Sequence, residues 1–426
     1  MSKIVEMPRA SCVLGGLNAV LTSLQNVSPI YHSGPGCCMQ TTAGVSGQAG
    51  LRGSSFLASV SLPCSNMLER EVVFGGEQKL RDEIDGSLEI IDADAYFVLT
   101  GCTAGIIGDD VAAVTAEYRN KGLPVYPIET PGFAGDTLLG YETAFDSFIE
   151  YIAEPQPRQA NLVNLLGVVP QHDPYWFGTL EELTRILNKL GLEVNSFFTQ
   201  RQGIETVKRS GSAALNIIVS PWLLKGAASK YEEKFGIPSI RFNGVPYGAT
   251  QTAEFIRGVG EALDLDKTLV ESVIEEENIY VYGLFETIIG ALSWKKFVVA
   301  ADAATAISIT RFLADDFSFT PVAVIITEPI WSSSDKDRIT KALSSLEYAK
   351  PPIISFLVDH YDIRQEIKKH DFTLLIGSSL EDEVARELGV QLNRLAFPIS
   401  DQLIINRTYA GYRGCLTLVE DLYNNL

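Results

Sequence analysis

The residues of this 426-residue chain with the clearest chemical potential are three cysteines, Cys12, Cys37 and Cys102. Cysteine thiolates are the ligands of iron-sulfur clusters, and a backbone amide or a helix N-terminus stabilises their charge. The chain has six cysteines, which is too few for a disulfide scaffold, and five of them lie within the first 102 residues. This uneven distribution directs attention to the N-terminal part of the chain.

Each of the three cysteines lies at a turn that leads into a predicted helix. Cys12 follows Ser11, a good N-cap residue, and Cys37 follows the turn sequence SGPG, whose glycines let backbone amides approach a sulfur. Cys102 follows the buried strand AYFVLTG and opens a helix. Because strand-to-helix turns of one α/β domain converge on the same sheet edge, we predict that the three cysteines bind a metal together. The alternative is that each is a small core residue.

The other cysteines and the histidines are weaker candidates. We expect Cys38 and Cys64 to be core residues or free thiols, and Cys415 to be buried in a C-terminal helix. The four histidines lack the spacing of a zinc site. Only His32, five residues before Cys37, could donate a hydrogen bond to a cluster or a turn, and simple packing is the alternative.

Motifs for nucleotide binding and for hydrolysis are absent. The sequence contains no GxxxxGK[ST] loop, no GxSxG elbow and no GxGxxG after a predicted strand. The FGGEQKLRDEI segment (74–84) is similar to a phosphate-binding loop, but we interpret it as a tight strand-to-helix link. We therefore assign no catalytic residue to this chain.

Short β-branched runs alternate with amphipathic stretches of helical length along almost the whole chain. This alternation is typical of parallel sheets covered by crossover helices. The small-residue segment 41–55 interrupts it, and we expect a surface loop there, with a cofactor cover as the alternative. The predicted strands are 95–101, 161–169, 214–220, 295–301, 321–327, 352–358 and 372–377. We predict an α/β fold of three doubly wound, Rossmann-like domains with parallel sheets.

Two changes in composition suggest domain boundaries. The proline-rich polar segment EPQPRQAN (154–161) predicts a linker, and a new series of strands and helices starts near Trp294. We predict a cluster-binding N-terminal domain (1–157), an α/β domain (158–293) and a C-terminal α/β domain (294–426).

The charge and the hydropathy of the chain exclude several classes of partner. The formal net charge is -19, from 53 acidic and 34 basic residues, and no basic cluster is present. Nucleic acid and anionic membranes are therefore poor partners. No stretch reaches the roughly 20 apolar residues that span a bilayer, and the start of the chain lacks a signal sequence. We expect a soluble, cytoplasmic protein.

Taken in order, these motifs resemble component 1 of the nitrogenase superfamily, and specifically its β-type subunit. Besides Cys12, the match runs through HSGPGC (32–37), SNMLEREVVFGG (65–76), TGCTAGIIGDD (100–110), ETPGFAG (129–135) and RLAFPISDQLIINRTYAGYRG (394–414). The resemblance implies that Cys12, Cys37 and Cys102 are three ligands of an [8Fe-7S] P-cluster. Three cysteines of a homologous α-type subunit would complete this cluster.

The resemblance also implies the other partners. A separate ATP-dependent iron protein would deliver electrons to the P-cluster, which would pass them to an iron-sulfur catalytic cofactor in the α-type subunit of an α2β2 complex. No cysteine lies between positions 103 and 414, so this chain lacks the mid-chain cysteine that anchors that cofactor. The resemblance therefore implies an electron relay in this chain and substrate binding in its partner.

Two departures from molybdenum nitrogenase narrow the prediction. The serine that can bind the oxidised P-cluster in that enzyme falls at Gly132, so ligand exchange through it is excluded, and the long N-terminal extension of that β-subunit is missing. Among the shortened relatives we favour methylthio-alkane reductase, which cleaves carbon-sulfur bonds. The alternatives are the β-subunit of an alternative or molybdenum nitrogenase, a scaffold for cofactor assembly, and an α/β protein without a cluster.

Overall fold

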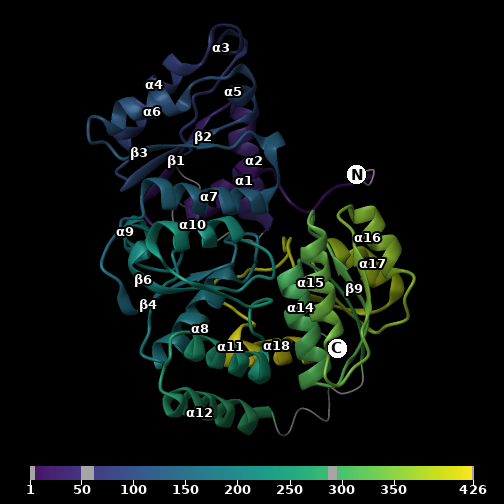
Figure 1. The fold of residues 1–426 in the computed structure, drawn as a ribbon. Helices are drawn as coiled ribbons and strands as arrows, with labels where there is room; N and C mark the ends of the chain where they lie inside the picture. The colour runs from purple at the N-terminus through teal and green to yellow at the C-terminus, as the bar shows by residue number, and fades with distance from the viewer. Residues whose placement is uncertain (1–4, 49–61, 286–294, 425–426) are drawn as a thin grey trace.

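The computed structural model describes residues 5–48, 62–285 and 295–424. Its strands form three separate parallel sheets (Figure 1), with the orders β1-β2-β3, β5-β4-β6-β7 and β10-β9-β8-β11-β12. The strands are β1 (Val27–His32), β2 (Ala95–Thr100), β3 (Val125–Glu129), β4 (Gln159–Leu166), β5 (Glu193–Asn195), β6 (Ala213–Ile218), β7 (Ser239–Arg241), β8 (Lys296–Ala301), β9 (Thr320–Ile326), β10 (Ile353–Phe356), β11 (Leu374–Gly377) and β12 (Gln391–Arg394). All seven strands named from the sequence are present, and the predicted α/β class is confirmed.

Helices connect these strands and cover the sheets. Those of the first sheet are α1 (Val13–Ser23), α2 (Pro35–Gln48), α3 (Glu69–Phe74), α4 (Glu77–Ile90), α5 (Cys102–Ile107), α6 (Val111–Arg119) and α7 (Thr137–Tyr151). The second sheet has α8 (Trp176–Lys189), α9 (Ile204–Arg209), α10 (Lys225–Phe235), α11 (Gly248–Ala262) and α12 (Lys267–Phe285). The third has α14 (Ala303–Arg311), α15 (Ser333–Ser344), α16 (His360–Ile367), α17 (Asp382–Leu388) and α18 (Gly411–Asn424).

The inner strands of the first and third sheets are buried on both faces, because alternate residues enter different cores. In β2, Phe97 and Leu99 belong to the large central core, whereas Tyr96 and Val98 pack with residues of α4 and α6 on the other face. The third sheet has the same arrangement, with a separate small core on its outer face. Burial on both faces explains why these strands are continuous apolar runs in the sequence.

Two segments pack away from their neighbours in sequence. The C-terminal helix α18 lies against α8 and α11 of the second sheet, and residues 5–9 lie on the third sheet beside α16 (Figure 1). The predicted boundaries at 157/158 and 293/294 stay predictions. They fall just before β4 and β8, but the two crossing segments tie the three sheets together.

Three local predictions were wrong or incomplete. Residues 41–48 of the expected surface loop form the end of helix α2, and the rest of that loop up to residue 55 lies outside the described residues. The link at 74–84 joins two helices, α3 and α4, because Gly75 has a positive φ of 89° and ends α3 there. The stretch after Cys102 is divided into α5 and α6 by Gly108, which ends α5 in a left-handed conformation.

None of the helices in the described ranges is long and apolar enough to cross a bilayer.

A ladder of three buried asparagines links the strands of the second sheet. Asn164 on β4 accepts a hydrogen bond from Asn195 on β5 and donates one to Asn216 on β6, each at 2.8 Å. All three side chains are fully buried. Buried amides without partners cost about 1 to 3 kcal/mol each, so the ladder fixes the register of three strands.

We expect Asn164→Ala to lower the free energy of unfolding by about 3 kcal/mol, because it leaves the Asn195 donor and the Asn216 acceptor without a partner. Urea denaturation measures the change. Asn188→Ala, on the exposed face of α8, is the matched control and should change stability by less than about 0.5 kcal/mol. Equal stability of both variants would contradict the role of the ladder.

Candidate functional site

The three cysteines predicted to bind a metal lie at the start of three helices, as expected. Cys12 is the N-cap of α1, Cys37 lies in the first turn of α2, and Cys102 is the first residue of α5, directly after β2. At such positions the unpaired amides and the helix dipole favour a negative sulfur. All three cysteines therefore have the helix-start setting that the sequence predicted.

The sulfurs of Cys12 and Cys102 approach the same point of the backbone, at Gly132. A Cβ atom placed on Gly132 would lie 3.0 Å from the Cys102 Sγ and 3.2 Å from the Cys12 Sγ. The Gly132 amide also donates a hydrogen bond to the Cys102 Sγ at 3.1 Å. Any larger residue at 132 would push the two sulfurs apart, so the glycine makes their close approach possible.

Cys37 completes the group from the surface side. Its side chain is exposed, while those of Cys12 and Cys102 are half-buried. Burial raises the pKa of the Cys37 thiol, and the nearby sulfurs of Cys102, Cys12 and Cys64 raise it further. Packing three thiolates together therefore costs electrostatic energy, which a bound cationic metal would offset.

Cys38 and Cys64 form a second, inner pair of thiols. Cys38 is buried, and Cys64 is half-buried beside β1, where it accepts a hydrogen bond from the Asn66 amide at 3.4 Å. A hydrogen bond between the two thiols is the main cause that raises the pKa of Cys38 and lowers that of Cys64. Both are free thiols, and Cys415 is buried in α18, as the sequence predicted.

His32 is fully buried at the end of β1 and makes two hydrogen bonds, neither of them to a cysteine. Its Nδ1 lies 2.9 Å from the Ser65 Oγ and its Nε2 lies 2.9 Å from the Asp109 Oδ2. Asp109 also accepts a hydrogen bond from the Gly76 amide at 2.9 Å. Burial lowers the pKa of His32, and the Asp109 carboxylate opposes this shift. The network ties the turn before α4 to the strand end that precedes Cys37.

Sequence reasoning selected His32 but not its partners Ser65 and Asp109. Both partners lie inside SNMLEREVVFGG and TGCTAGIIGDD, two of the segments on which the family resemblance rests, and this is the signal that could have identified them. The order Ser-His-Asp is not a hydrolytic site here, because the Ser65 hydroxyl is buried at 2 % exposure and no substrate could reach it.

Large apolar side chains are exposed on the same turns that carry the cysteines. Met39 follows Cys37 on α2, Ile106 lies on α5, and Phe133 follows Gly132, with exposed fractions of 66 %, 73 % and 66 %. A second exposed group consists of Val73 and Phe74, at the end of α3. This helix contacts α5. Contiguous exposed apolar residues are typical of surfaces that bind another protein.

The cysteines do not form a complete mononuclear site. Within the ranges that the structure describes, no group of three or more His, Cys, Asp or Glu side chains is arranged to hold one metal ion. Three thiols spread over neighbouring turns at a surface suit a larger group with further ligands from elsewhere.

A cavity lies between the second and third sheets, at the carboxyl ends of β4, β6, β8 and β9. It is lined by several ionisable residues, among them His172, Asp173, Asp302 and Glu328. Glu328 accepts hydrogen bonds from the Trp222 Nε1 at 2.8 Å and from the Ala303 amide at 3.0 Å. The carboxyl ends of parallel strands are where α/β proteins form cavities, so its position follows from the topology.

Burial is the main cause of the pKa shifts in this cavity. It raises the pKa of Glu328 to about 8 and that of Asp173 to about 7, and the Asp302 charge adds to both shifts. Burial also lowers the pKa of His172. Near neutral pH Glu328 and His172 are therefore predominantly uncharged, whereas Asp173 is about half charged.

The comparisons with known proteins agree with this architecture. The solved structure "Nitrogenase Cp1 at pH 6.5" matches this chain with a TM-score of 0.81 and 21% sequence identity. The match covers 100% of this chain and 94% of the chain in that structure. This likeness establishes the fold. Residues 11–426 match the model of the nitrogenase component 1 type oxidoreductases, and the chain belongs to this family.

Three relatives define the range of similarity within the family. The nitrogenase molybdenum-iron protein beta chain of Methanococcus maripaludis is 22% identical over 98% of this chain and 94% of its own length. The iron-molybdenum cofactor biosynthesis protein NifE of Nostoc sp. is 26% identical over 98% of this chain and 83% of its own length. The NifE protein of Clostridium pasteurianum is 27% identical over 64% of this chain, which spans 59% of that protein.

We expect Glu328→Gln to stabilise the fold more as the pH rises. The folded pKa of Glu328 lies above the unfolded value near 4.5, so keeping the carboxyl buried costs stability progressively between about pH 4.5 and 8. Gln keeps the acceptor for Trp222 and removes this cost. The gain in the free energy of unfolding should grow by about 4 kcal/mol from pH 5 to pH 8.5.

Urea denaturation at several pH values measures this gain. The control is Glu89→Gln, which removes an exposed carboxylate on α4 and should change stability by less than about 0.5 kcal/mol at each pH. A gain from Glu328→Gln that is equal at pH 5 and pH 8.5 would show that burial does not shift this group.

Proposed function

We propose that this chain is the β-type, electron-relay subunit of a two-component nitrogenase-like reductase. Cys12, Cys37 and Cys102 would hold half of an [8Fe-7S] P-cluster, and a homologous α-type subunit would hold the other half. The observation that carries the proposal is the approach of two cysteine sulfurs to the bare backbone of Gly132, with the exposed Cys37 beside them.

The chemistry of the donor set fits such a cluster. Iron-sulfur clusters are held by thiolates, and the three thiols stand at helix starts where amides favour their charged form. The Gly132 amide donates to the Cys102 sulfur, and hydrogen bonds of this kind tune the potential of a cluster. When bound, the cluster would accept and release electrons, while this chain's residues orient it and exclude water from its inner side.

The surface around the site suits two protein partners. The exposed apolar residues Met39, Ile106 and Phe133 lie on the cysteine-bearing turns, where a subunit that shares the cluster would have to dock. Val73 and Phe74 provide a separate apolar surface, which we assign to the ATP-dependent iron protein that the family resemblance implies. A relay between an electron donor and an acceptor subunit requires contacts with both proteins near the cluster.

For the reaction we favour methylthio-alkane reductase, the reductive cleavage of a carbon-sulfur bond. Gly132 stands where molybdenum nitrogenase has a serine that can bind its oxidised P-cluster, and the chain lacks a cysteine from 103 to 414 to anchor a catalytic cofactor. The cofactor and the substrate would therefore belong to the partner. A β-subunit of an alternative or molybdenum nitrogenase, which reduces dinitrogen, is supported equally by the beta-chain relatives.

A cofactor-assembly scaffold is the second candidate function. The specific observation in its favour is the similarity to NifE, a cofactor biosynthesis protein, over 98% of this chain. A scaffold would release a cofactor to another protein and would not turn over substrate. The complete set of three cysteines favours the relay, because a relay keeps its cluster.

We expect the complex of this chain with its α-type partner, purified without oxygen, to be brown and to contain about eight irons per αβ pair at the shared site. Iron analysis and visible absorption measure this. A colourless, iron-free complex with full reductase activity would refute the relay. Assays with an iron protein against dinitrogen, acetylene and methylthio-alkanes then distinguish the reactions, and absence of all turnover together with cofactor transfer would indicate the scaffold.

We expect Cys102→Ala to lower reductase turnover by at least about tenfold, because it removes a ligand and the acceptor of the Gly132 amide. The free energy of unfolding should fall by less than about 2 kcal/mol, since the side chain is only half-buried. The matched control is Cys415→Ala, a fully buried cysteine in α18, which should lose stability but keep its iron. Normal turnover in Cys102→Ala would remove this residue from the site.

A further inference from the structure

The N-terminal segment before Cys12 is held by the third sheet, although Cys12 itself belongs to the first. Asp359, at the start of α16, accepts hydrogen bonds from the backbone amides of Val5, Glu6 and Met7, and Pro8 pairs with it as an isolated antiparallel bridge. The His360 amide donates to the Met7 carbonyl at 3.0 Å. One buried carboxylate thus organises the whole approach of the chain to the cysteine site.

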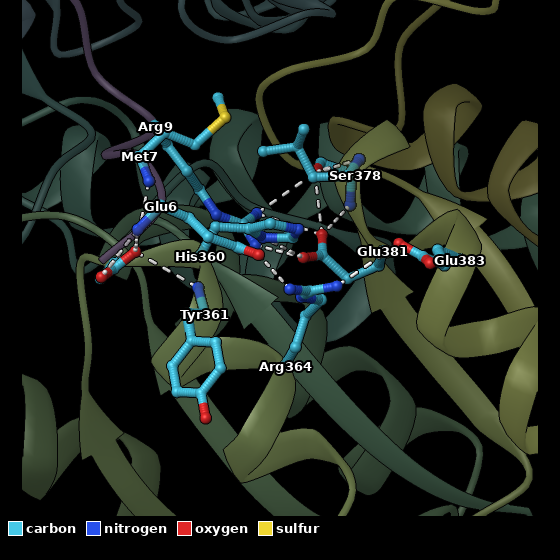
Figure 2. Close-up of polar contacts among 11 residues, drawn as sticks. Glu6, Met7, Arg9, His360, Tyr361, Arg364, Ser378, Glu381 and Glu383 are labelled. Carbon is cyan, nitrogen blue, oxygen red and sulfur yellow. Dashed lines mark hydrogen bonds and ion pairs between the residues drawn. The ribbon is translucent and has the colours of Figure 1, made fainter. Parts of the chain in front are cut away.

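Arg9 ends this segment in a buried ion pair with Glu381, the residue just before α17. Figure 2 shows the guanidinium pointing at the Glu381 carboxylate and the Ser378 hydroxyl. The side chains are 3 % and 0 % exposed, and Glu381 also accepts hydrogen bonds from the Ser378 amide and hydroxyl at 2.8 Å. Removing one partner of a buried ion pair leaves the charge of the other partner buried and uncompensated. Loss of either Arg9 or Glu381 should therefore disrupt the whole contact.

Only two residues separate Arg9 from Cys12, so a loss of the anchor would loosen the backbone that leads to the thiol. On the other side, the Ser11 carbonyl accepts the Thr137 amide and the Val13 amide donates to the Gly135 carbonyl, each at 3.0 Å. Cys12 therefore lies between one clamp on the first sheet and another on the third. Without the second clamp, residues 5–10 would lose the hydrogen bonds and the ion pair that hold them, so this part of the backbone would open more often.

We propose that Arg9 and Glu381 are positioning residues for Cys12, which hold its thiol against Gly132 by fixing the N-terminal segment to the third sheet. The inference rests on the proposed function, in which Cys12 is a ligand of the cluster. The third sheet then contributes to the cluster site, because a shift of Glu381 would move Cys12 through Arg9 without contacting it.

The test compares the reactivity of individual cysteines in the full-length chain after removal of metal by a chelator. Iodoacetamide labelling followed by mass spectrometry gives a rate for each cysteine. Arg9→Gln should raise the rate at Cys12 by about fivefold, because the local segment opens more often. The rates at Cys37, which is already exposed, and at Cys102, which other elements hold, should change by less than about twofold.

Two variants serve as controls. Arg9→Lys keeps a positive charge beside Glu381 but loses the two-pronged contact of the guanidinium, so its rate should lie between those of the wild type and Arg9→Gln. Arg386→Gln removes an exposed guanidinium that pairs with Asp382 on the same helix, α17, and should leave all rates unchanged.

An unchanged rate at Cys12 in Arg9→Gln would overturn the proposal, and so would a parallel rise at Cys12, Cys102 and Cys415, which would indicate general unfolding. If Arg9→Gln yields no folded chain, Asp359→Asn is measured in the same way and judged by the same outcomes. The relay proposal fails separately, by an iron-free wild-type complex, whereas these labelling rates need no iron.

In the complex with the partner, the same variant should release iron to a chelator about threefold faster than the wild type. Equal release rates in Arg9→Gln and the wild type would contradict a positioning role for the cluster, even if Cys12 labelling had changed.

Discussion

The close approach of two sulfurs to the backbone at Gly132 is the constraint on which the rest of this structure depends. It requires a residue without a side chain at one position and two helix starts that aim at it, α1 from Cys12 and α5 from Cys102. Like-charged thiolates repel each other, so this arrangement is unfavourable in an empty protein and becomes favourable with a cationic group. The surrounding elements supply the rigidity that keeps the sulfurs together.

That rigidity comes from several parts of the chain. The parallel sheet sets the ends of β1 and β2 side by side, and the His32 network fixes the turn that precedes α4 to the same region. The N-terminal segment arrives from the third sheet, and α18 returns to the second. The three sheets are therefore coupled through crossing segments as well as through a common apolar core.

The polar groups that the fold buries differ in what they do. The ladder around Asn164 and the Arg9–Glu381 pair each form several hydrogen bonds and specify where strands and segments lie, although the Asn195 Oδ1 and the Arg9 Nε have no hydrogen-bond partner among the described residues. The carboxyls of Glu328 and Asp173 have raised pKa values instead, so they make stability depend on pH. Asn164 lies within β4, Glu328 and Asp173 lie beyond the carboxyl ends of β9 and β4, and the Arg9–Glu381 pair joins the N-terminal segment to the start of α17.

Local patterns in the sequence were sufficient for the α/β class, for seven strands and for the helix-start setting of Cys12, Cys37 and Cys102, because apolar periodicity and turn residues act over a few positions. They were insufficient for the end of α2 at 41–48, where the composition predicted a loop and the backbone is helical. The sequence by itself determined which residues could bind a cluster. Only the tertiary structure decided that Gly132 brings two of the sulfurs together and that Arg9 reaches Glu381, 372 positions away, because such contacts depend on how distant segments pack.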